Sequence, residues 1–228
     1  MMKKKALSLA ALLFAVLIIS SFTACGKIPS PPVPDQDGSP AYPELADVHI
    51  PNHLLTKTFD GITASYQPKK WFFDSSAGVF AVYYIATLEN AVNDNVTVTV
   101  RDEKCDIDES YIKKVTDEFD ADAVYGEKLG AIGLMSFENS TVLYCESTLS
   151  MTDELIDECL KDGTITEGFI EAEGGREALK NKPLCSEIQL HADIDGRTVV
   201  VTGVYSDEAN KKAVLHAAKL ILKTIKLS

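Results

Sequence analysis

The sequence predicts an α+β domain, in which helices pack on an antiparallel sheet, behind an N-terminal export segment. Two Asp-Gly pairs, Asp60-Gly61 and Asp195-Gly196, each separate two short segments that read as extended strands, an arrangement typical of a β-hairpin. Apolar residues recur at helical spacing in residues 108–119 and 207–227. A helix and a sheet each have an apolar face to bury, so packing one on the other is the economical arrangement.

The export segment comes first and has the organisation of a signal peptide over residues 1–24. Lys3, Lys4 and Lys5 precede an apolar run of 14 residues, 6–19, which is shorter than the roughly 20 apolar residues that span a bilayer. Residues 22–25, Phe-Thr-Ala-Cys, resemble the lipobox of bacterial lipoproteins, although Phe22 stands where leucine is usual. The resemblance implies that Cys25 is lipidated and becomes the mature N-terminus. The alternatives are an ordinary secretory signal with a chance cysteine and an uncleaved membrane anchor.

Lipidation would place the protein at the cell membrane, facing outside the cytoplasm. Two acyl chains such as palmitate hold far better than one, because each buried methylene contributes about 0.8 kcal/mol. Residues 25–55 contain seven prolines, and such a density favours an extended polyproline II tether at about 3.1 Å per residue. A proline-rich ligand at 31–34 for another domain is the alternative interpretation.

The chain carries 34 acidic and 22 basic residues, a formal net charge of −12. This balance argues against a nucleic-acid partner and against a domain that lies on an anionic lipid surface.

A single folded domain is expected over residues 56–228. Its first hairpin covers 58–66, followed by an apolar run at 79–88 and a strand at 95–100 with Val96, Val98 and Val100 on one face. The helix at 108–119 begins with acidic residues, which suit the positive end of its dipole.

The second half continues with strands at 131–137 and 141–149, separated by a turn at 138–140. A short helix is expected at 152–160 with Gly163 as its stop, whereas 164–181 has too little periodicity to assign. The second hairpin covers 187–194 and 197–205, and the closing helix covers 207–227 with Ser206 as its cap.

Tyr66, Pro68 and Trp71, followed by this order of strands and helices, resemble the PsbP/Mog1-like superfamily over about residues 56–228. The resemblance implies a three-layer α/β/α sandwich around an antiparallel sheet. The family consists mostly of binding and assembly factors, so no catalytic set carries over. Trp71 is interpreted as a core anchor rather than as a ligand-stacking platform.

Residues with reactive or metal-binding side chains show no catalytic or metal-site spacing. Cys105, Cys145, Cys159 and Cys185 allow three disulfide pairings in an exported protein, but they can equally be buried thiols. His49 and His53 in the tether suit weak metal binding at best, and the Asp193-Ile194-Asp195-Gly196 stretch after His191 reads more simply as a hairpin. Calcium could use the carboxylates of residues 102–109, but the EF-hand spacing is absent and a solvated acidic loop is preferred.

The sequence therefore predicts a membrane-anchored extracytoplasmic lipoprotein that is not an enzyme and that acts as a protein-binding or assembly factor of the cell envelope. Expected partners are the lipid bilayer, through acylated Cys25, and an envelope protein, with no nucleic acid. No catalytic residue, cofactor or metal is expected. The alternative function is a solute- or ion-binding accessory lipoprotein, and an enzyme with a divergent acid/base pair ranks third.

Overall fold

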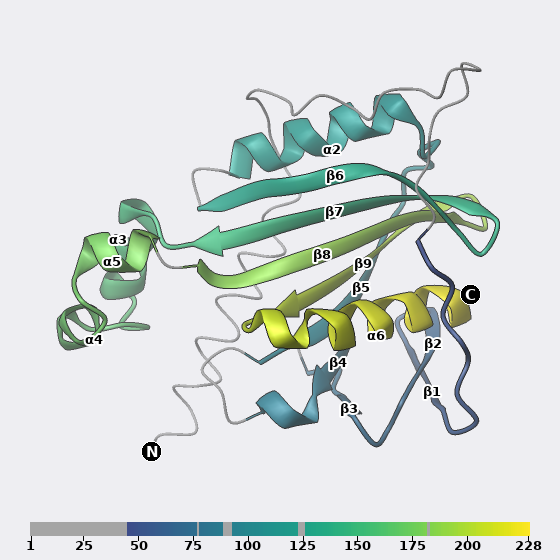
Figure 1. Ribbon diagram of the computed structural model, residues 1–228, viewed down its shortest axis with the longest axis horizontal. Coiled ribbons are helices and arrows are strands. Elements are labelled where there is room, and N and C mark those ends of the chain that lie inside the picture. Colours follow the sequence, from purple (N-terminus) through teal and green to yellow (C-terminus); the bar gives the residue numbers. More distant parts are fainter. Residues whose placement is uncertain (1–44, 77, 89–92, 123–125, 182) are drawn as a thin grey trace.

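A seven-stranded antiparallel sheet forms the centre of the computed structural model, which describes residues 45–228 except 77, 89–92, 123–125 and 182 (Figure 1). The strand order is β3-β4-β5-β9-β8-β7-β6, and every neighbouring pair is antiparallel. The predicted α+β class with an antiparallel sheet is confirmed. The strands are β3 (Trp71–Phe73), β4 (Phe80–Tyr84), β5 (Asn95–Arg101), β6 (Glu127–Phe137), β7 (Ser140–Ser150), β8 (Pro183–Ile194) and β9 (Arg197–Tyr205).

Both predicted Asp-Gly hairpins form at the expected turns. Asp60 and Gly61 have φ values of 47° and 74°, and Asp195 and Gly196 have 54° and 78°. Because paired positive φ values match the twist of the flanking strands, Asp-Gly sequences favour this type of two-residue turn. The turn between β6 and β7 uses the same left-handed region at Glu138 and Asn139.

Two helices cover opposite faces of the large sheet. Along β7, Val142 and Tyr144 join the core beneath α6 (Lys211–Thr224), whereas Leu143 and Cys145 pack with Tyr111 of α2 (Glu109–Asp122). Successive strand residues point to opposite faces, so this alternation shows that the sheet lies between two helical layers. The layered arrangement expected from the family resemblance is therefore present in the fold.

A second, three-stranded sheet closes the α6 side of the molecule. Its order is β1-β2-β10, with β1 (Leu55–Phe59), β2 (Ile62–Tyr66) and β10 (Lys226–Leu227). Ala64 of β2 is fully buried in the α6 core. The closing helix α6 therefore packs against both sheets.

The closing helix is shorter than predicted, and its expected cap is wrong. A 3₁₀ turn, η3 (Glu208–Asn210), precedes α6, and the Asp207 side chain accepts a hydrogen bond from the Ala209 amide. Ser206 instead donates from its amide and hydroxyl to Asp94 Oδ1, at 2.9 and 2.8 Å. The buried Asp94 carboxylate, in the residue just before β5, binds Ser206 instead, and sequence periodicity does not reveal such a contact.

The residues that precede β1 pack against the domain, although the tether was expected to continue unpacked to residue 55. Lys219 Nζ donates to the carbonyl of Ala46, and Lys223 Nζ donates to the carbonyl of Val48 at 3.1 Å. Val48 is only 3% exposed and belongs to the main core, and the Leu45 amide donates to the Ser136 carbonyl at 2.8 Å. We call residues 45–48 the strap; the folded unit includes it.

Candidate functional site

The predicted lipidation site, Cys25, and the signal peptide lie outside the described residues, so both stay predictions. Among the residues that the structure describes, no helix is long and apolar enough to cross a membrane.

The four other cysteines are free thiols in the structure. Cys145, Cys159 and Cys185 are buried and Cys105 is half-buried. Burial raises the pKa of the Cys159 thiol to about 11 and that of Cys145 well above its usual range. The Cys145 and Cys159 thiols therefore stay protonated at neutral pH and are poor nucleophiles.

The acidic loop before α2 is solvated. Glu103 binds Lys114 at 2.6 Å, and Asp108 caps the helix by accepting from the Ser110 and Tyr111 amides. Within the described ranges, no group of three or more His, Cys, Asp and Glu side chains can hold a metal ion. His49 and His53, at the entry to β1, are both exposed.

A chain of polar side chains lies buried between α2 and the sheet. Tyr111 Oη lies 3.0 Å from His191 Nδ1, and His191 Nε2 lies 2.9 Å from Gln189 Oε1. Gln189 in turn donates to Glu187 at 3.4 Å. On the neighbouring strands, the Ser147 hydroxyl donates to Glu127 at 2.9 Å. Alternation along β8 places Glu187, Gln189 and His191 on one face.

Burial controls the charge of this network. Burial, together with the nearby Arg101, lowers the pKa of His191 to about 3, so its imidazole is neutral at physiological pH. Burial and the neighbouring Glu127 carboxylate raise the pKa of Glu187 well above its usual range. His191 is 0% and Glu187 1% exposed, so a substrate in solvent does not reach either group. The network ties α2 to the sheet and gives no open site for acid/base chemistry.

Trp71 is a core residue, as its sequence context favours. It is 3% exposed, and its ring centroid lies 5.0 Å from that of Tyr84. Beside it, a shallow indentation of about 180 Å³, which includes open solvent, is lined by Tyr66, Gln67, Trp71, His216, Ala217 and Leu220. Pockets for drug-sized ligands are typically about 300–1,000 Å³, so this indentation is too small for such a ligand.

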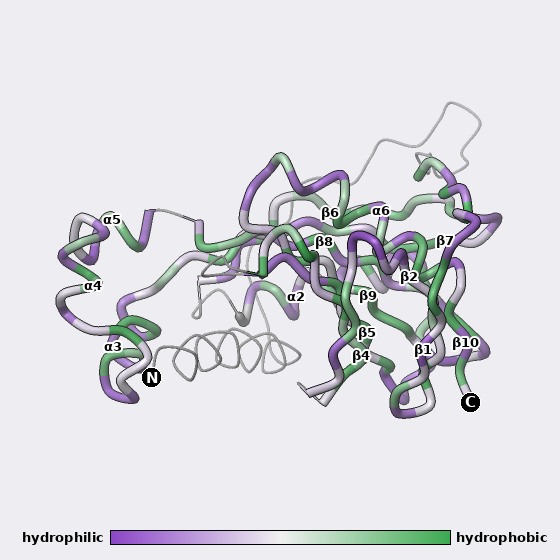
Figure 2. The backbone as a smooth tube through the Cα atoms, turned by 90° about the horizontal axis from the view of Figure 1, so that it is seen from below, coloured by the Kyte–Doolittle hydropathy of each residue, from purple (hydrophilic) through white to green (hydrophobic). Residues whose placement is uncertain are grey.

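A small helical lobe projects beyond the ends of β7 and β8, and it is the most prominent surface feature of the molecule (Figures 1 and 2). It consists of α3 (Asp153–Lys161), α4 (Glu167–Ala172) and α5 (Arg176–Asn181). Thr152 and Thr166 cap the first two helices by accepting from the amides of Leu155 and Phe169, both at 3.2 Å. The lobe buries its own apolar cluster: Met151, Leu155, Ile156, Cys159, Ile165, Ile170 and Leu179.

The lobe is acidic and carries one large exposed aromatic side chain. Residues 152–181 contain nine carboxylates and three basic side chains. Arg176 pairs with Asp157 at 2.7 Å and Lys180 with Asp153 at 2.8 Å, so two of the three cations are bound within the lobe. Phe169 on α4 is 41% exposed. Aromatic side chains are enriched at protein interfaces relative to the rest of the surface.

The lobe includes the segment that sequence periodicity leaves unassigned. The predicted helix at 152–160 with Gly163 as its stop is confirmed, and Gly163 has a φ of 77°. The two following helices have only six residues each, which is too short for a periodic pattern. The available signals were Thr166 as a cap and the pair Gly174-Gly175, both with φ of 93°.

Comparisons with known proteins give structural neighbours only. No family model matches the chain, and no curated protein matches it. The structure is similar to the solution structure of cyanobacterial PsbP (CyanoP) from Synechocystis sp. PCC 6803, with a TM-score of 0.42, 11% identity, and coverage of 77% of this chain and 92% of that one. It is also similar to the crystal structure of LpqN, involved in cell envelope biogenesis of Mycobacterium tuberculosis, with a TM-score of 0.42, 10% identity, and coverage of 78% and 92%.

Proposed function

We propose that this protein is a lipid-anchored, non-enzymatic factor of the cell envelope that binds a basic protein partner through the helical lobe. The single observation that carries the proposal is the exposed Phe169 ring on an acidic lobe that projects from the sheet. The lipid anchor rests on Cys25 and the residues before it.

The lobe has the features of a protein-binding surface. A rigid aromatic side chain supplies contact area at low entropic cost. The nine carboxylates of the lobe would speed the encounter with a basic partner. The lobe is held in shape by its own core and ion pairs, so little ordering is needed on binding.

The buried polar network supports a non-enzymatic role, because its acids and histidine are closed to solvent. The indentation beside Trp71 is too small for a drug-sized solute, so it gives no support to the alternative solute-binding function.

A capture experiment tests the lobe. The full chain, immobilised in detergent, is exposed to envelope extract of the producing organism at low salt. We expect a specific set of basic proteins to be retained and to be released as ionic strength rises. Phe169→Ser should weaken retention by at least about tenfold, in the range of interface hot spots, and Glu167→Lys with Glu171→Lys should abolish it.

The matched control reverses two exposed acids outside the lobe, Asp102→Lys with Asp106→Lys. This control changes the net charge by as much as the lobe double variant, and partner retention should be unaffected. If the control weakens binding as much as the lobe variant, general charge and not the lobe holds the partner. If no protein is retained and a metabolite or calcium raises the melting temperature, the solute-binding alternative holds.

A further inference from the structure

We propose that one edge of the domain is a membrane-docking surface that lies on anionic lipid headgroups. We call it the lysine rim, and the residues that carry it are Ile50, Leu55, Lys57, Lys69, Lys70 and Phe72. The proposal rests on the lipid anchor proposed above, which brings the domain to the bilayer; it adds which side of the domain faces the lipid.

The rim differs in charge from the rest of an acidic chain. Residues 48–73 contain three lysines and two histidines but a single acid, Asp60, and this stretch is flanked by Asp47 and Asp74. Lys57, Lys69 and Lys70 are exposed. Although the net charge of −12 argues against an anionic surface, the Debye length is only about 8 Å at physiological ionic strength. The membrane therefore responds to the local lysines, and the carboxylates of the projecting lobe are screened.

Exposed apolar side chains gather in the same part of the chain. Of the six large apolar residues that are exposed in the described structure, five fall between residues 50 and 88, and the sixth is Phe169 on the lobe. Ile50, Leu55 and Phe72 are 45%, 47% and 45% exposed. Lysines interleaved with exposed aliphatic and aromatic side chains are typical of surfaces that lie in the membrane interface.

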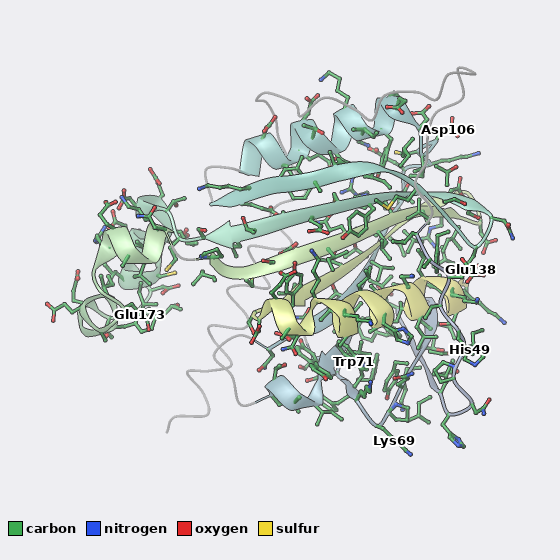
Figure 3. All side chains as sticks on the ribbon, in the orientation of Figure 1. His49, Lys69, Trp71, Asp106, Glu138 and Glu173 are labelled. Carbon is green, nitrogen blue, oxygen red and sulfur yellow. The ribbon has the colours of Figure 1, made fainter. Side chains whose placement is uncertain are left out.

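The fold brings these segments together along one edge. Leu55 of β1 is paired with Tyr66 of β2, and the chain then turns through the Gln67–Lys70 hydrogen bond into β3. The Ile85 amide donates to the Lys70 carbonyl at 2.9 Å, which places the short helix η1 (Ile85–Thr87) beside this turn. Figure 3 shows Lys69 at this lower edge, below Trp71, while Glu173 lies on the lobe at the far left.

The path of the chain to the anchor is compatible with this orientation. Nineteen residues separate Cys25 from Leu45, and twenty peptide units span at most about 70 Å. The strap fixes the point where the chain enters the domain, and His49 and Ile50 follow it directly. The rim therefore begins at the point where the anchored chain joins the fold. With the rim on the lipid, the acidic lobe is free to meet a protein.

Two exposed phenylalanines provide a matched test. Phe72→Trp reports on the rim and Phe169→Trp on the lobe, each in the full chain reconstituted through its anchor into vesicles that contain phosphatidylglycerol and brominated acyl chains. We expect quenching and a blue shift for Phe72→Trp beyond the background of the buried Trp71, and neither for Phe169→Trp. Ile50→Trp is a second rim reporter should Phe72→Trp perturb β3.

Charge reversal completes the test. Lys69→Glu with Lys70→Glu in the Phe72→Trp background should remove most of the quenching, as should vesicles of phosphatidylcholine alone. The control reverses two exposed lysines elsewhere, Lys104→Glu with Lys128→Glu, and should leave the quenching unchanged.

Three results would overturn the rim. The first is equal quenching of Phe72→Trp and Phe169→Trp. The second is that neither Phe72→Trp nor Ile50→Trp is quenched on anionic vesicles. The third is that the control pair, Lys104→Glu with Lys128→Glu, removes as much quenching as the rim pair. A chain that does not stay with the vesicles at all refutes the anchor, and the rim proposal falls with it. Loss of partner capture with normal quenching would instead contradict only the lobe.

Discussion

Replacement of Ile221 by alanine should destabilise the whole domain, because this side chain is buried in the core that α6 shares with both sheets. Ile221 is 0% exposed and belongs to the largest core cluster, together with Ala64 of β2 and Val201 of β9. Truncation of a fully buried isoleucine to alanine costs about 2–5 kcal/mol, since both the transfer free energy and the contacts around the cavity are lost. Native domains have a free energy of unfolding of only about 5–15 kcal/mol.

The expected change is large enough to measure by thermal and urea unfolding. For a domain of this size each kcal/mol shifts the melting temperature by about 2–4 °C, so Ile221→Ala should lower it by about 4–20 °C. Ile221→Val should cost only about 0.5–1.5 kcal/mol. The matched control is Ile50→Ala, at a side chain that is 45% exposed, and it should stay within about 0.5 kcal/mol of the parent.

A melting temperature for Ile221→Ala equal to that of Ile50→Ala would refute the packing of α6 described above. A larger loss of unfolding free energy in Ile221→Ala than in Ile221→Val supports the cavity argument. Equal losses in the two variants would indicate strain instead.

Two further predictions concern the buried acid and the anchor. The raised pKa of Glu187 means that the folded state keeps a proton which the unfolded chain loses above about pH 4.3, so its contribution to stability falls as pH rises from there toward the folded pKa. The melting temperature of Glu187→Gln relative to the parent should therefore increase between pH 4 and pH 8, and a difference independent of pH would contradict the buried, protonated carboxyl. Cys25→Ser removes the thiol that would carry the diacylglycerol, so the protein should leave the membrane fraction or remain as precursor. Normal mature size with normal membrane retention would argue against lipidation.

Local sequence was sufficient for the turns and for most of the regular elements. Asp60-Gly61 and Asp195-Gly196 adopt the left-handed backbone that their side chains tolerate. The alternation at 95–100 became β5, and Asp108 caps α2 where acidic residues were expected. These features depend on a few neighbouring residues, which is why a single sequence reveals them.

The candidate site was only partly predictable. The lobe buries seven apolar side chains that are spread over residues 151–179, and α4 and α5 are stable only because they share that cluster. No short window contains this information, since helices of six residues are marginal without tertiary packing.

Sequence by itself determined the acidic balance, the two hairpins and the amphipathic helices, because each is a property of composition or of local spacing. The export segment and its cysteine are likewise read from local sequence, and they stay predictions. Tertiary structure decided that the strap joins the core, that Ser206 serves Asp94 rather than the helix, and that His191 and Glu187 are closed to solvent. It also separated the charges, with an acidic lobe beyond β7 and β8 and exposed lysines along the edge beside β1 and β3. Ala46 and Lys219 are in contact although they lie 173 positions apart. Such a contact depends on how the chain folds back on itself, and neither composition nor local periodicity reveals it.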